Sequence, residues 1–152
     1  MEQKLLSSVV FMGRIEAEAE SAKSDWAVIS ISERDGEPAK LHEEWHSILR
    51  LEFHDIDKAQ EPYDLFSGEQ AMQIIRFVDD HASKVRGILV HCRAGISRSA
   101  AVAKWVAIRY GLPFPESYSL YNRHVFAVLN NVAAYAAMYR IGEQSGVEDW
   151  GK

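Results

Sequence analysis

Cysteine is nearly absent from this sequence, since Cys92 is the only one among 152 residues. An intramolecular disulfide and a cysteine-rich zinc site are therefore excluded. A single cysteine is either a small buried apolar residue or a reactive thiol, and composition alone favours the buried interpretation. The residues around Cys92 must decide between the two.

Long apolar segments are absent as well. No apolar run approaches the roughly 18 residues that a membrane-spanning helix needs. Residues 1–6 lack the apolar segment and the small-residue cleavage site of a secretory signal. We therefore expect a cytoplasmic protein without a membrane partner.

Positive charge is in the minority, with 17 Lys and Arg against 22 Asp and Glu and a net charge of −5. A nucleic-acid partner is therefore not expected. Because this overall charge weakly repels anionic ligands, a phosphate site would need positive groups placed locally. The length and a hydrophobic fraction of 47% indicate one domain over residues 1–152, with a flexible tail at 144–152. The oligomeric state stays open.

Strand patterns and helix patterns alternate along the chain. Short runs rich in Val and Ile or alternating in polarity predict strands over residues 8–12, 26–31, 48–53 and 87–91. Helical spacing predicts helices over residues 15–23, 67–84 and 99–110, and two more within 115–143. Ser67 and Gln70 form a capping box for the helix at 67–84, and Asn122 is a candidate cap or break.

This order predicts an α/β fold, a single domain whose central, mostly parallel sheet is flanked by helices. In such sheets, ligands bind at the carboxyl ends of the strands. Cys92 lies at such an end, directly after the strand at 87–91. The loop that joins this strand to the next helix is therefore the first place to look for a site.

The loop reads Cys-Arg-Ala-Gly-Ile-Ser-Arg-Ser from Cys92 to Ser99. Ala94 and Gly95 allow a tight turn, in which backbone amides point inward as an anion-binding nest. The following helix adds its positive N-terminal end, and Arg98 offers a planar fork that matches two phosphoryl oxygens. The same positive surroundings favour the thiolate form of Cys92. The loop therefore suits a phosphate held next to a nucleophilic sulfur.

The segment His91-Cys92-x5-Arg98-Ser99 resembles the signature loop of the cysteine-dependent protein tyrosine and dual-specificity phosphatases, especially their compact dual-specificity and small prokaryotic members. This resemblance implies a phosphatase that hydrolyses phosphomonoesters through a phosphocysteine intermediate on Cys92, with no metal and no cofactor. The implied substrate is a phosphorylated protein or a small phosphoester. Among phosphorylated residues, phosphotyrosine is the first candidate substrate, and phosphoserine and phosphothreonine remain alternatives.

The resemblance also assigns roles within the loop. It makes Cys92 the nucleophile, Ser99 a hydrogen-bond partner of the leaving thiolate, and His91 a support beneath the loop. We expect the side chain of Arg93 to be mainly solvated. Phosphate binding is assigned to the residues that lie between Cys92 and Ser99, namely Arg93, Ala94, Gly95, Ile96, Ser97 and Arg98.

The resemblance further implies an aspartate upstream of the cysteine that protonates the leaving oxygen. Asp55 and Asp57 both fit. We predict that Asp55 is this acid, because its distance in sequence from the end of the strand at 48–53 fits the compact dual-specificity pattern better than that of Asp57. Asp57 is the alternative general acid.

A zinc protease is a competing hypothesis. Residues 42–46 read His-Glu-Glu-Trp-His and fit the H-E-x-x-H pattern, with His54 or Asp55 conceivable as a third ligand. That pattern needs a helix, whereas Pro38 precedes it closely and a predicted strand begins at residue 48. The context therefore argues against a zinc site.

A catalytically dead phosphate-binding module is the remaining alternative. Dead relatives of this loop typically lack the cysteine or the arginine. Both Cys92 and Arg98 are present here, so the sequence favours the enzyme.

Overall fold

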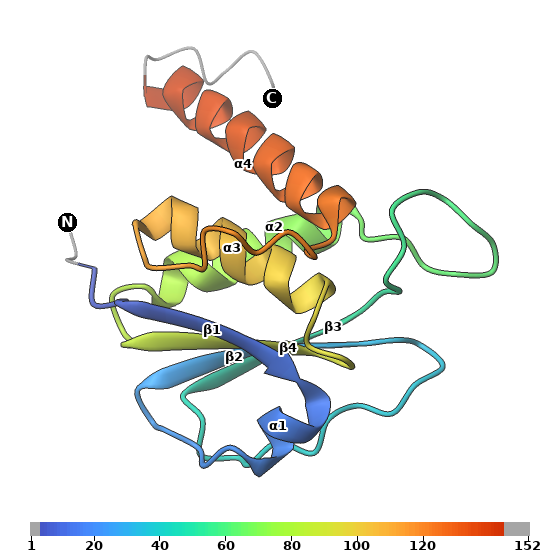
Figure 1. Ribbon diagram of the computed structural model, residues 1–152. Coiled ribbons are helices and arrows are strands. Elements are labelled where there is room, and N and C mark those ends of the chain that lie inside the picture. Colours follow the sequence, from blue (N-terminus) through green and yellow to red (C-terminus); the bar gives the residue numbers. More distant parts are fainter. Residues whose placement is uncertain (1–3, 145–152) are drawn as a thin grey trace.

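A computed structural model of the chain, which describes residues 4–144, contains four strands and four helices within that range (Figure 1). They follow the order β1 (Ser8–Gly13), α1 (Arg14–Ala19), β2 (Trp26–Ser32), β3 (Ser47–Glu52), α2 (Gly68–His81), β4 (Gly87–Cys92), α3 (Arg98–Tyr110) and α4 (Arg123–Gln144). The α/β fold predicted from the sequence is confirmed.

The four strands form one sheet in the order β1-β4-β2-β3, and every neighbouring pair is parallel. Strand β4 is an inner strand, and all six of its residues are buried. Its last residue, Cys92, lies opposite Gly13 at the end of β1, and His91 lies opposite Ser30 of β2. The carboxyl ends of the strands therefore meet around Cys92.

Helices cover both faces of the sheet, but unequally. Figure 1 shows α2, α3 and α4 on one side and the short α1 on the other. The larger core, on the side of α2 and α3, includes Ile75, Val102 and Leu129. A smaller core around Trp45, Val28 and Leu89 lies on the side of α1. Burial of these side chains is the main stabilising contribution that fixes the strand ends.

Most of the predicted elements form within a few residues of their expected ends, and the predicted capping box is present. Ser67 Oγ accepts a hydrogen bond from the Gln70 amide at 3.2 Å, and Gln70 Oε1 accepts one from the Ser67 amide at 3.1 Å. The helix expected at 15–23 is shorter and ends at Ala19.

The prediction of two helices within residues 115–143 is wrong. Residues 112–122 form a connection without helix, and a single helix, α4, begins at Arg123. Asn122 acts as its cap, because its Oδ1 accepts the Val125 amide at 2.9 Å. Of the expected tail at 144–152, Gln144 ends α4 and the rest lies outside the described residues.

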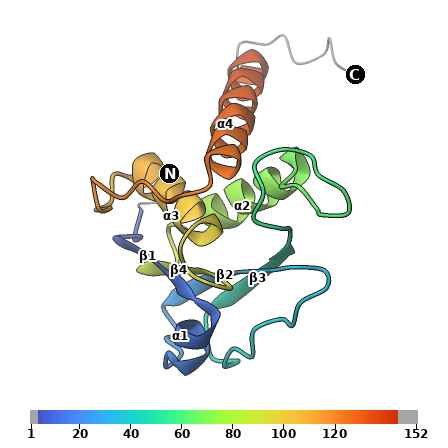
Figure 2. The same cartoon turned by 45° about the vertical axis from the view of Figure 1, so that its right-hand side comes forward.

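Helix α4 stands out from the body of the domain beyond α2 and α3 (Figure 2). Its first turns pack on the core through Val125 and Leu129, whereas Tyr135 and Met138 further along are exposed. Among the described residues, no helix combines the length and the apolar character that crossing a membrane would require.

Candidate active site

The sulfur of Cys92 lies at the bottom of a tight loop between β4 and α3. The residue is only 2% exposed. Its Sγ lies 3.1 Å from Ser99 Oγ and accepts a hydrogen bond from the Gly95 amide at 3.3 Å. One contact comes from within the loop and the other from the first turn of α3, so both ends of the loop segment reach the sulfur.

The loop keeps its shape because it is built against the end of β1. Gly95 has a φ of 74°, in the left-handed region. A Cβ at this position would lie 2.2 Å from the backbone nitrogen of Gly13. The amide of Arg14 also donates a hydrogen bond to the Arg93 carbonyl at 3.1 Å. Only glycine combines this backbone conformation with so close an approach.

We expect Gly95→Ala to destabilise the protein strongly, because it adds a steric clash to the cost of a positive φ. Gly111→Ala is a matched control, since Gly111 has a φ of 66° and no atom within 4 Å of its would-be Cβ. The free energy of unfolding of the control should fall by about 1–2 kcal/mol because of the positive φ alone. For Gly95→Ala it should fall by about 1–3 kcal/mol more because of overpacking. Chemical denaturation measures both losses, and equal losses would contradict this packing account.

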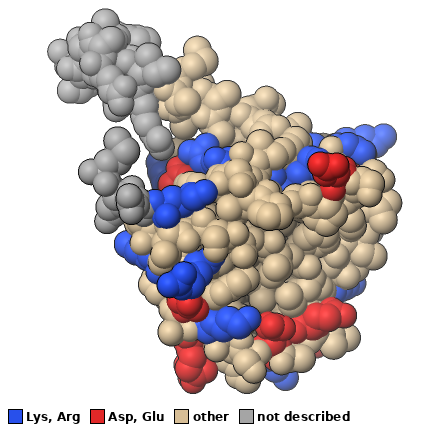
Figure 3. Space-filling model, turned by 60° about the vertical axis from the view of Figure 1, so that its left-hand side comes forward, with Lys and Arg blue, Asp and Glu red and all other residues tan. Residues whose placement is uncertain are grey.

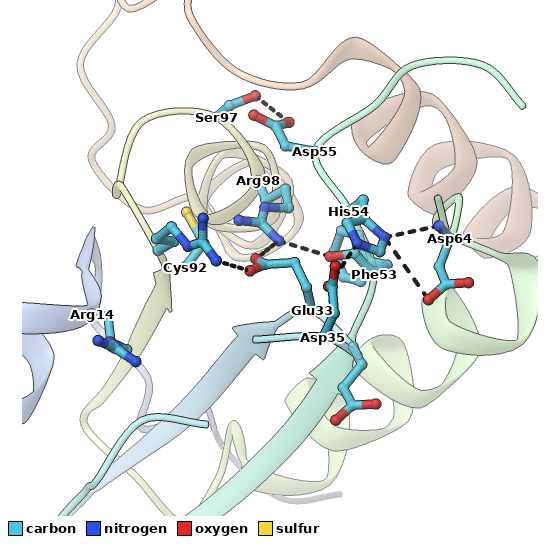
Figure 4. Close-up of polar contacts among 12 residues, drawn as sticks. Arg14, Glu33, Asp35, Phe53, His54, Asp55, Asp64, Cys92, Ser97 and Arg98 are labelled. Carbon is cyan, nitrogen blue, oxygen red and sulfur yellow. Dashed lines mark hydrogen bonds and ion pairs between the residues drawn. The ribbon is translucent and has the colours of Figure 1, made fainter. Parts of the chain in front are cut away.

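Arg98 is a buried guanidinium with one end already occupied. It is 5% exposed, and its Nη1 donates to the Phe53 carbonyl at 2.7 Å and lies 2.5 Å from a carboxylate oxygen of Glu33. Its buried Nε has no hydrogen-bond partner among the described residues. Figure 4 shows the side chain beside Cys92. The edge made by Nε and Nη2 therefore remains for a ligand.

Glu33, directly after β2, holds the arginines of the loop in place. It is 7% exposed, and its carboxylate lies between Arg98 and Arg93, whose Nη2 is 2.9 Å away (Figure 4). The prediction that Arg93 is mainly solvated holds for most of its side chain, which is 71% exposed. Glu33 was not among the predicted site residues, although its place after a predicted strand was a usable signal.

His91 supports the loop from within the sheet. Its Nδ1 lies 3.4 Å from the Cys92 carbonyl, which can only accept, and its Nε2 lies 2.6 Å from Ser30 Oγ. Burial lowers the pKa of His91, so the neutral ring donates from Nδ1 and accepts from the Ser30 hydroxyl. Ser30 is a second residue that the sequence analysis missed.

Asp55 lies next to the loop, on the side opposite the sheet. Its Oδ1 accepts a hydrogen bond from Ser97 Oγ at 2.8 Å (Figure 4). It accepts a second one from Asn122 Nδ2, also at 2.8 Å. Asp57 lines a cavity together with Asp55, but its side chain makes no hydrogen bond within the described part of the chain. The structure therefore anchors Asp55 to the loop and leaves Asp57 unanchored. The sequence predicts Asn122 only as a cap or break of a helix, so its contact with Asp55 is new.

The segment that carries Asp55 is closed at its base by His54. The His54 amide donates to the Asp64 carbonyl, and the Asp64 amide donates to His54 Nδ1, both at 2.8 Å. His54 Nε2 therefore carries the ring proton and donates a hydrogen bond to Asp35 Oδ1 at 3.1 Å. This hydrogen bond lowers the pKa of Asp35. Asp35 follows Glu33 by two residues, so one short segment after β2 supports both Arg98 and the Asp55 segment.

Comparison with solved structures identifies the fold that carries this site. Neither a protein-family model nor a curated protein matches the sequence. The crystal structure of human DUSP28 aligns with a TM-score of 0.60 at 17% identity, over 89% of this chain and 98% of that one. The chain has the fold of a dual-specificity phosphatase.

Two further solved structures share this fold. The human tyrosine phosphatase-like serine/threonine/tyrosine-interacting protein aligns with a TM-score of 0.53 at 19% identity, over 91% of this chain and 97% of that one. Tk-PTP in its active form aligns with a TM-score of 0.55 at 18% identity, over 88% of this chain and 96% of that one. The likeness covers most of the chain.

In this phosphatase fold the zinc-protease pattern has no structural basis. Residues 42–46 form turns and bends rather than a helix, and Trp45 between the two histidines is buried. No group of three or more potential ligand side chains in the described part of the chain is placed to hold a metal ion. The observed backbone therefore removes this alternative.

Among the described residues, the face of the molecule drawn in Figure 3 carries no broad positive field. Figure 3 shows basic and acidic side chains interspersed on one face of the molecule, with neutral surface between them. The net charge of the chain is −5. We therefore expect the amides of the loop and Arg98 to be the main attraction for an anion.

Proposed function

We propose that this protein is a phosphatase that transfers the phosphoryl group of a phosphomonoester to Cys92 and then to water. The observation that carries the proposal is that one loop holds both the Cys92 sulfur and the Nε and Nη2 edge of Arg98, which is unpartnered within residues 4–144. A guanidinium edge matches two phosphoryl oxygens, and inward amides neutralise the charge that develops on them. The loop supplies this neutralisation without a metal or a cofactor.

The proposed reaction has two displacements at phosphorus. In the first, the Cys92 thiolate forms the sulfur–phosphorus bond, the bond from phosphorus to the ester oxygen breaks, and Asp55 gives its proton to that oxygen. In the second, water attacks phosphorus, Asp55 takes its proton, and the thiolate leaves. Ser99, 3.1 Å from the sulfur, stabilises the leaving thiolate by a hydrogen bond.

The position of Asp55 supports its assignment as the acid. Both hydrogen bonds to Asp55 go to Oδ1, so Oδ2 can carry the proton that is transferred. Asp57 has no such contacts, and we keep it as the alternative acid.

We propose a phosphorylated protein as the substrate, with phosphotyrosine first and phosphoserine or phosphothreonine and small phosphoesters as further candidates. The likeness of the fold to a human tyrosine phosphatase-like protein supports this choice. A panel of phosphopeptides and small phosphoesters tests it. The kcat/KM for phosphotyrosine peptides should exceed that for the other substrates. Activity on small phosphoesters alone would contradict a protein substrate.

A phosphate-binding interaction module is the second candidate, because one similar structure is that of an interacting protein. The presence of both Cys92 and Arg98 in a closed loop favours the enzyme. Turnover of p-nitrophenyl phosphate separates the two, since a module binds the ester without releasing p-nitrophenol.

We expect Asp55→Asn to slow the reaction in a way that depends on the leaving group. Loss of a general acid lowers kcat by about 100-fold or more for a poor leaving group such as an alkyl or unsubstituted phenyl ester. The loss should be much smaller for p-nitrophenyl phosphate, whose leaving oxygen needs no proton. The descending high-pH limb of the kcat profile should also flatten.

Asp57→Asn is the matched control for this prediction, because it removes a neighbouring carboxylate from the same cavity. It should keep the native dependence on the leaving group. If Asp57→Asn shows the selective loss and Asp55→Asn does not, the assignment of the acid is wrong although Cys92 remains the nucleophile.

A further inference from the structure

The cavity beside Asp55 is the place where the leaving group must lie, if the proposed function is correct. The cavity has a volume of about 420 Å³, and its lining includes Asp55, Ser97 and Asn122. A general acid must reach the leaving oxygen within hydrogen-bond distance. The rest of the leaving group therefore extends from Asp55 into this cavity, whose lining contacts the part of the substrate next to the phosphate.

Arg123 is the one cation among the described residues that line this cavity. Its guanidinium lies over the ring of Tyr121, 4.2 Å from the centroid, and also donates to the Tyr121 hydroxyl. Its Nη2 donates to the Ser119 carbonyl at 3.3 Å. These contacts hold an otherwise flexible side chain in one arrangement, so less conformational entropy is lost when it binds a ligand.

We infer that Arg123 selects phosphorylated peptides that carry an Asp or Glu next to the phosphorylated residue. The inference rests on the proposed function and names its substrate class more closely. A side-chain carboxylate near the leaving oxygen enters a cavity where a fixed guanidinium is available. Arg123 is exposed, so the attraction is moderate and salt-dependent.

A second cavity provides the control. It has a volume of about 350 Å³ and is lined by Arg14 and Arg93 together with the acidic Glu33, Asp35 and Glu37. It shares no lining residue with the cavity beside Asp55. Each of its arginines is already paired with a carboxylate, Arg93 with Glu33 at 2.9 Å and Arg14 with Glu18 at 3.9 Å, so this cavity does not favour an acidic peptide. Arg14 lies near the loop but lines only this second cavity. Its replacement is therefore a control for the loss of an arginine outside the cavity beside Asp55.

The experiment compares two phosphotyrosine peptides that differ only in having Glu or Gln beside the phosphotyrosine. We expect the native protein to prefer the Glu peptide by roughly five-fold in kcat/KM at low salt, the scale of an exposed ion pair. Arg123→Gln should abolish the preference, and Arg14→Gln should keep it. Asp57→Asn should increase it, because Asp57 is a carboxylate in the same cavity. The preference should fall at about 0.5 M salt.

The outcomes separate the inference from the proposed function. If neither peptide is turned over by the native protein and p-nitrophenyl phosphate is also inert, the proposed function fails. If both peptides are turned over equally, or if Arg14→Gln and not Arg123→Gln removes the preference, the proposed function stands and the inference about Arg123 is overturned. A preference that survives in Arg123→Gln overturns it as well.

Discussion

Cys92→Ser is expected to abolish turnover while leaving phosphate binding intact. A serine hydroxyl fits in place of the thiol, because the site needs only a small atom between Ser99 and the Gly95 amide. A hydroxyl is scarcely ionised near pH 7, so it cannot act as the nucleophile without an adjacent base. We expect kcat for p-nitrophenyl phosphate to fall by at least about 100-fold, which steady-state kinetics measures.

Binding separates a chemical loss from a structural one. The serine variant should bind vanadate or inorganic phosphate about as tightly as the native protein in a calorimetric titration, since Arg98 and the loop amides are unchanged. If the serine variant releases p-nitrophenol over many turnovers at more than a few per cent of the native rate, covalent catalysis by Cys92 is contradicted.

Arg98→Lys is expected to be almost as damaging, although it keeps the positive charge. The guanidinium uses Nη1 for Phe53 and Glu33 and leaves Nε and Nη2 for the substrate. An ammonium cannot make these contacts in two directions at once. The loss of a charge-assisted contact of about 1.5–3 kcal/mol predicts a fall in kcat/KM of roughly 10- to 100-fold.

Arg109→Lys is the matched control on the same helix. Arg109 makes a bidentate contact with Asp79, through Nε at 2.9 Å and Nη2 at 2.8 Å, and lies at the other end of α3 from the loop. This variant should lose a little stability and keep its kcat/KM. Near-native kinetics in Arg98→Lys would contradict the role of the loop arginine.

The central part of the site could be predicted because it is contiguous in sequence. Residues 91–99 carry the thiol, the turn and the arginine, and their chemistry is local once a strand precedes them and a helix follows. The parallel sheet was predictable for the same reason, since each strand shows its own apolar pattern. Strand order was not, because it depends on which strands pack together in space.

The supporting residues could not be predicted because they reach the loop through tertiary contacts. Glu33 and Arg98 are far apart in the sequence, yet their side chains form an ion pair. Asn122 joins α4 to Asp55 by a similar long-range contact. Residues 115–122 were included in a predicted helix because their local pattern does not show that Tyr118 donates to the Ile96 carbonyl and packs on Phe11.

The measurement that tests the central claim most directly is rapid acid quenching of the native protein during turnover of p-nitrophenyl phosphate. Acid stops hydrolysis of the intermediate, and mass spectrometry of the digested protein then locates any covalent phosphoryl group. Our account predicts one phosphoryl group on the peptide that contains Cys92, and none on that peptide in Cys92→Ser. Native-rate turnover with the phosphoryl group on another residue, or with none on the protein, would contradict it.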